Sequence, residues 1–215
     1  MTHLFEAVRE AVDLGGPVVA VLIVISILTL ALVLYKLWQF SAAGVGRHRA
    51  LGEAVALWDA GDRTTARDRL SASTSYLAPV VAMGFAGPDG IRDRLLAEAD
   101  TRFARLERGF RFLDTVAQLA PLLGLFGTVL GMIDAFRALQ EAGAQVDPSL
   151  LAGGIWVALL TTAVGLVVAM PTSAVLSWLE ARMDAERVLA ERAINTIGNP
   201  IGRAEPAADP AAHHA

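Results

Sequence analysis

Three long stretches of the chain contain no charged residue, and they determine its predicted architecture. The stretches are 14–35, 115–133 and 148–179. A bilayer core about 30 Å thick is crossed by ~20 apolar residues of helix, so each stretch is long enough to span it. The pattern predicts an all-α integral membrane protein with long helices extending into the cytoplasm. The predicted transmembrane helices are 16–38, 113–137 and 150–179.

Helical periodicity and chain breakers divide the rest of the sequence. Apolar residues recur at helical spacing near the N-terminus, so residues 1–15 are expected to form an amphipathic helix on the outer membrane surface. Gly15-Gly16-Pro17 then turns the chain into the first span, which we expect to be retained rather than cleaved as a signal peptide. The other expected segments are a cytoplasmic helical segment at 39–112, an outer loop at 138–149, a cytoplasmic helix at 180–197 and a disordered tail at 198–215.

The cytoplasmic segment begins with short helices and ends with a regular apolar stripe. The short helices are expected at 50–59, 63–70 and 76–85. The stripe consists of Leu96, Ala99, Phe103, Leu106, Phe110 and Leu113. This spacing predicts one long helix from about residue 91 to about residue 139. The stripe packs either within one chain or also between subunits, and the sequence leaves both open.

The distribution of basic residues predicts the orientation in the membrane. One Lys or Arg precedes the first span, twelve lie between the first and second spans, one lies between the second and third, and four follow. Basic residues mark the cytoplasmic side. We therefore expect a multi-pass membrane protein with its N-terminus outside and its C-terminus in the cytoplasm.

Composition excludes several kinds of site. The chain is 54% hydrophobic with a mean hydropathy of +0.49 and contains no cysteine, so it has no disulfide or thiolate metal site. Its four histidines are scattered, its arginines alternate with acids, and no catalytic constellation is visible. We expect no enzyme activity, cofactor, metal or nucleic-acid partner. Arg182/Glu186 and Arg187/Glu191 are spaced i, i+4, which suits a solvated helix face.

Two transmembrane stretches carry stripes of small and hydroxylated residues. In the second span these are Gly124, Gly127, Thr128 and Gly131. In the third they are Gly154, Ala158, Thr161, Thr162, Gly165 and Ala169. Small residues let helix backbones approach closely, and threonine can hydrogen-bond across helices. The stripes indicate either tight helix packing alone or faces that line a shared, hydrated axis.

These residues resemble the signatures of a known family. The stretch APLLGLFGTVLGMI at 120–133 resembles the second-span signature of the ExbB/TolQ/MotA proton-channel family. The stretch ALLTTAVGL at 158–166, followed by Ala169-Met170-Pro171, resembles its third-span signature. The topology also matches, and the ExbB/TolQ branch fits better than the MotA branch.

The resemblance implies a pentamer in the inner membrane of a bacterial cell, with a periplasmic N-terminus and a cytoplasmic C-terminus. The second and third spans would line its central pore. Single-span ExbD/TolR-like subunits that carry an aspartate would sit in this pore, and proton flow would drive a TonB/TolA-like transducer. It also implies that Thr128 and Thr162, with Thr161 beside them, are the hydroxyls of the proton path. Four glycines would be pore-facing packing residues: Gly124, Gly127, Gly131 and Gly165.

One position departs from the family pattern. ExbB/TolQ-type third spans usually carry a glutamate where this chain has Val157. Valine can neither ionise nor relay a proton, and the third span has no other carboxylate. Three explanations remain open. The chain passes protons with hydroxyls, water and the partner's aspartate alone; it is a paralogue that no longer conducts; or the valine is an engineered substitution.

The sequence therefore favours a pentameric channel subunit that couples the proton motive force to outer-membrane import or envelope maintenance. The alternative is a non-conducting membrane scaffold that assembles ExbD/TolR-like subunits. A secondary transporter is a weaker third reading, because no inverted repeat or intramembrane charge is visible.

Overall fold

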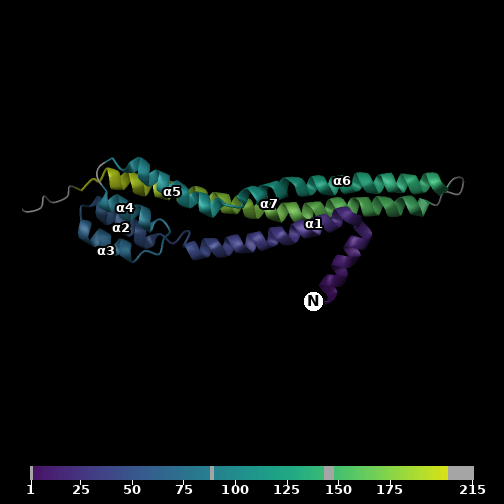
Figure 1. The fold of residues 1–215 in the computed structure, drawn as a ribbon, viewed down its shortest axis with the longest axis horizontal. Helices are drawn as coiled ribbons and strands as arrows, with labels where there is room; N and C mark the ends of the chain where they lie inside the picture. Colours follow the sequence, from purple (N-terminus) through teal and green to yellow (C-terminus); the bar gives the residue numbers. More distant parts are fainter. Residues whose placement is uncertain (1, 88–89, 143–147, 203–215) are drawn as a thin grey trace, which may run out of the picture. The chain divides into compact units, whose positions relative to one another are not determined.

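A computed structural model describes residues 2–87, 90–142 and 148–202, and this part of the chain consists of α-helices without strands. The helices are α1 Thr2–Ala43, α2 Arg49–Asp59, α3 Arg63–Ser71, α4 Ala78–Ala86, α5 Arg92–Glu107, α6 Phe110–Ala142 and α7 Pro148–Gly198 (Figure 1). Within the described residues, the helices long and apolar enough to cross a membrane are Gly16–Ala43, Phe110–Glu141 and Leu151–Gly198. The predicted fold class is confirmed.

The helices fall into two compact units. The first contains the chain up to Lys36 together with Gly109–Glu180, and the second contains Leu37–Arg108 together with the chain from Ala181. The first unit contains the apolar spans, whereas most of the charged residues lie in the second. The chemistry of the two units can therefore be considered separately.

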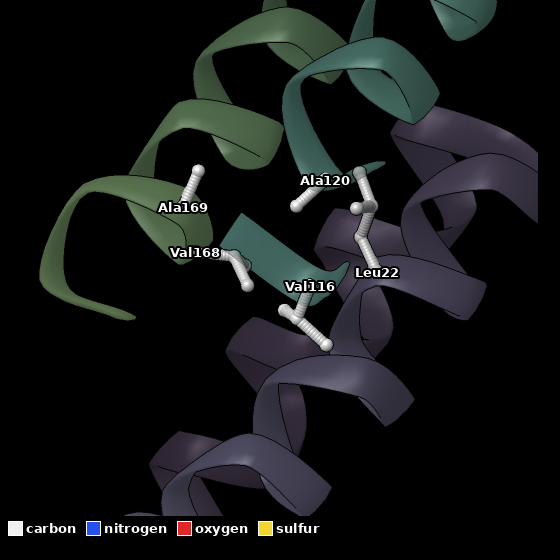
Figure 2. Close-up of a cluster of buried hydrophobic side chains, with 5 residues drawn as sticks. All are labelled: Leu22, Val116, Ala120, Val168 and Ala169. Carbon is white, nitrogen blue, oxygen red and sulfur yellow. The ribbon is translucent and has the colours of Figure 1, made fainter. Parts of the chain in front are cut away.

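The first unit is built on α1, α6 and the apolar part of α7. Gly16 has φ 66° and ψ −162°, so α1 is kinked where the Gly-Gly-Pro motif predicts a turn. Beyond the kink, one side chain of α1 packs with two from α6 and two from α7 (Figure 2). These residues are Leu22, Val116, Ala120, Val168 and Ala169. Large apolar side chains such as Phe126 and Trp156 are more than half exposed, as expected of surfaces that face lipid.

The second unit contains α2 to α5 and the charged part of α7. The short helices α2, α3 and α4 confirm the predicted ones. Asp62 caps α3 by accepting a hydrogen bond from the Thr65 N–H at 3.1 Å. The Trp58 ring stacks on Phe85 at a centroid distance of 4.1 Å and carries the Arg63 guanidinium 3.8 Å from its ring centroid. Residues 203–215, most of the predicted tail, lie outside the described residues.

The prediction of one uninterrupted helix from about 91 to about 139 is wrong. α5 ends at Glu107, and α6 begins at Phe110. Gly109 between them has φ +100°, a conformation that glycine adopts readily and other residues rarely do. A Cβ there would also lie 3.3 Å from Leu32 Cδ1. The sequence hides this break because the apolar spacing continues through it.

Candidate functional site

The predicted site residues lie along the contact between α6 and α7. The contacts show that the two helices run antiparallel. Gly131 meets Ala158 and Gly124 lies against Gly165, so the residue numbers fall along α6 as they rise along α7. A Cβ added at Gly165 would lie 2.5 Å from the Ala120 carbonyl oxygen, and one at Gly124 would lie 2.8 Å from the Thr161 carbonyl oxygen. These backbones touch directly, which only residues without large side chains allow. Gly124, Gly127, Gly131 and Gly165 are therefore packing residues of this hairpin.

Thr161 lies inside this contact. It is 2% exposed. Two carbonyl oxygens lie within hydrogen-bond distance of its hydroxyl, that of Gly124 on α6 at 3.0 Å and that of Ala158 on α7 at 2.7 Å. A Cβ at Gly127 would lie 2.7 Å from the Thr161 Oγ1. The hydroxyl therefore joins the two helices within one chain, and its predicted place in a proton path stays a prediction.

Thr128 and Thr162 lie on one side of the hairpin. Thr128 follows Gly127 by one residue and Thr162 follows Thr161 by one residue, and Gly127 contacts Thr161. Each step turns the side chain by about 100° in a right-handed helix. Because the helices are antiparallel, both steps lead to the same side of the contact. The rise is about 1.5 Å per residue, and the two steps run in opposite directions. The two threonines are therefore offset by about 3 Å along the helix axis.

The two hydroxyls differ in their hydrogen bonds. Thr128 Oγ1 donates to the Leu125 carbonyl oxygen at 2.6 Å, within its own helix. Thr162 Oγ1 is buried and has no hydrogen-bond partner among the described residues. A buried hydroxyl without a partner costs about 1–3 kcal/mol. Thr162 is therefore the member of the pair whose hydroxyl makes no bond within the described part of this chain.

Val157 lies on the opposite side of the contact from this pair. It precedes Ala158 by one residue, so its side chain turns the other way. It is also three helical turns before Val168, which packs against Leu22 of α1. Within one chain, the family's carboxylate position and the threonine pair thus point away from each other. Asp114 and Asp134 at the ends of α6 are exposed, and no metal-binding cluster occurs among the described residues.

A polar cluster in the second unit escaped the sequence analysis. Glu186 of α7 is 3% exposed, and its carboxylate lies 2.6 Å from His48 Nε2. It also accepts hydrogen bonds from the Tyr76 hydroxyl at 2.9 Å and from the Gly46 N–H at 2.9 Å. His48 Nδ1 lies 2.9 Å from Ser75 Oγ. The cluster fastens α7 to the two loops that precede α2 and α4.

This cluster corrects the interpretation of the last helix. We expected Arg182/Glu186 and Arg187/Glu191 to decorate a solvated face, but Glu186 is buried and Arg187 pairs with Glu107 and Asp100. The missed signal was the position of Glu186 between the buried residues Met183 and Ala190. Burial and the nearby carboxylate raise the pKa of Tyr76 well above its ordinary value. Tyr76 therefore stays protonated and donates its hydrogen to Glu186.

Comparison with known proteins agrees with the signatures in α6 and α7. Residues 63–192 match the family described as the MotA/TolQ/ExbB proton channel family. A biopolymer transport protein named ExbB-like from Synechocystis sp. is 34% identical over 166 residues, which cover 73% of this chain and 64% of that protein.

Two further relatives match over shorter stretches. A biopolymer transport protein exbB of Vibrio cholerae is 37% identical over 41% of this chain and 39% of its own length. A Tol-Pal system protein TolQ of Haemophilus influenzae is 44% identical over 37% of this chain and 35% of its own length. The matched parts of this chain thus span less than two-thirds of these relatives.

Proposed function

Because the chain belongs to the MotA/TolQ/ExbB proton channel family, we propose that it is an ExbB/TolQ-type channel subunit of a bacterial inner membrane. In this proposal five copies surround a pore that holds ExbD/TolR-like single-span subunits. Proton flow through the pore drives a TonB/TolA-like transducer for outer-membrane import or envelope maintenance. The N-terminus faces the periplasm and the C-terminus the cytoplasm.

The placement of Thr162 is the observation that carries the proposal. Its hydroxyl is buried in the membrane-spanning part of α7 without a partner among the described residues, and it shares a side of the hairpin with Thr128. Burying a hydroxyl without a hydrogen bond is costly, which supports a hydrogen-bonding partner for Thr162 in the assembly. A carboxylate on a partner helix would fit, because it accepts hydrogen bonds from hydroxyl donors.

The test is proton flux in liposomes that contain the chain with its single-span partner. Proton flux with the unmodified chain would support the channel. This flux should be lost when the partner is exchanged for a variant with asparagine in place of its aspartate. Val157→Glu is the matched comparison. If only Val157→Glu conducts, the chain is the non-conducting scaffold, an alternative that the valine at this position specifically favours. A stable monomer by native mass spectrometry would contradict both.

Thr162→Val is expected to reduce the flux of a conducting complex about tenfold, because one hydrogen bond of about 1.4 kcal/mol is lost from the path. The native mass should not change, since valine has nearly the same shape. Thr115→Val is the control: its hydroxyl donates within its own helix, to the Arg111 carbonyl oxygen at 2.8 Å. Unchanged flux in Thr162→Val would remove this residue from the mechanism.

A further inference from the structure

A groove of about 520 Å³ lies between α2 and the charged part of α7, both in the second unit. Aliphatic side chains from the two helices make up most of its lining, and Val188 among them is 60% exposed. The others include Leu51, Val55, Ala185 and Leu189. Pockets that bind ligands enclose roughly 300–1,000 Å³, so the groove has room for an occupant. The described part of the chain leaves this apolar surface open to solvent.

Arg192 of α7 brings an unpaired positive charge to the lining of this groove. The residue is exposed, and its guanidinium makes no ion pair or hydrogen bond with any residue that the structure describes. Arg187, five residues earlier on α7, differs because it pairs with Glu107 and Asp100. The groove therefore combines an apolar floor with a cation that is free to pair with a carboxylate.

The described part of the chain ends at the edge of this groove. Asp59, the last residue of α2, also lines the groove, and its Oδ1 accepts a hydrogen bond from the Ile201 N–H at 2.8 Å. The Asp59 carbonyl oxygen accepts a second bond from the Gly202 N–H at 2.6 Å. These two bonds hold the chain against the end of α2, so the residues that follow Gly202 start beside the groove.

The segment that follows has suitable chemistry and sufficient reach. Residues 203–210 read RAEPAADP, in which small apolar residues alternate with a few charges. Proline favours an extended backbone in the residue before it, which here is Glu205. Eight extended residues span up to about 26 Å, whereas the groove follows α2 from Leu51 to Asp59 for about 12 Å. Glu205 itself lies within about 10 Å of Gly202.

We propose that residues 203–210 bind in this groove of their own chain, with the Glu205 carboxylate paired to the Arg192 guanidinium. The small residues after Glu205 then cover Val188 and remove its apolar surface from water. Ala207 meets Val188 in this register, because two extended residues and one helical turn each cover about 6 Å. The tether favours this occupant over a separate molecule, since a short linker holds its segment at a millimolar effective concentration.

Cysteine labelling of the full chain in lipid nanodiscs tests whether the groove is covered. The chain has no cysteine, so Val188→Cys introduces a single thiol at an exposed position. Maleimide should label this thiol about tenfold faster when residues 203–215 are removed, as expected if the segment occupies the groove about 90% of the time. Ala104→Cys, exposed on α5 outside the groove, should label at the same rate with and without these residues. Equal rates for Val188→Cys in the two chains would overturn the proposal.

A second measurement identifies the occupant and its register. Val188→Cys combined with Ala207→Cys should form a disulfide within one chain when copper phenanthroline is added as the oxidant. Glu205→Arg and Arg192→Glu should each slow this cross-link about threefold, the effect of losing an exposed ion pair, and the two changes together should restore the rate. Cross-links between copies would overturn the proposal, because a second copy would then supply the segment. A double exchange that stays slow would also overturn it.

Discussion

Gly165→Ala is expected to separate α6 from α7 and to lower the free energy of unfolding by about 3 kcal/mol, the upper range for overpacking a tight core. The new Cβ would lie 2.5 Å from the Ala120 carbonyl oxygen and 3.3 Å from the Ala120 carbonyl carbon. Backbone atoms cannot rotate away as a side chain can, so one helix has to move. That movement also weakens the Thr161 bond to the Gly124 carbonyl oxygen, which is 3.0 Å long.

The measurement is thermal unfolding of the full chain in detergent or nanodiscs, with Gly153→Ala as the control. Gly153 lies on the same helix, and a Cβ there meets nothing within 4 Å. Alanine is a better helix former than glycine by about 1 kcal/mol, so this variant should be as stable as the original chain or more stable. If both variants behave alike, close packing at Gly165 does not hold the hairpin together.

Glu186→Ala is expected to lower the free energy of unfolding by about 3 kcal/mol, because each buried hydrogen-bonding group left without its acceptor costs about 1–3 kcal/mol. The substitution leaves His48, the Tyr76 hydroxyl and the Gly46 N–H without their shared acceptor. These groups come from two different loops, so both loops should loosen. Hydrogen exchange at the amides of 44–48 and 73–77 should therefore rise together.

Asp184→Ala is the matched control for Glu186→Ala. It removes a carboxylate two residues away on α7, from an exposed position. Its unfolding free energy and its loop exchange should remain close to those of the original chain, because exposed charges contribute little. Equal losses in the two variants would show that net charge on α7 matters and that the Glu186 contacts do not.

Several features could be predicted from the sequence because they depend on local composition. The absence of charge over about twenty residues indicates a membrane span whatever the packing. Gly16 and Pro17 signal the kink in α1, and Gly61 with Asp62 signals the break before α3. The signatures around Gly127 and Thr161 identified the family without any coordinates.

Other features escaped because the pattern of one helix does not say which residues it meets. The stripe through Phe103 and Phe110 keeps its spacing across Gly109, so this spacing outweighed the glycine that marks the break. Glu186 looks like half of an i, i+4 surface pair until α2 and α4 bring His48 and Tyr76 to it.

By itself, the sequence determined the membrane spans, the helical class and the family, because each depends on the residue types present in a continuous stretch. Only the tertiary structure decided the different hydrogen bonds of the neighbouring threonines. Thr161 turns toward α6 and bonds the Gly124 carbonyl, whereas Thr162 turns to the side that carries Thr128. A rotation of about 100° per residue separates them, and only the position of α6 shows which direction is the packed one.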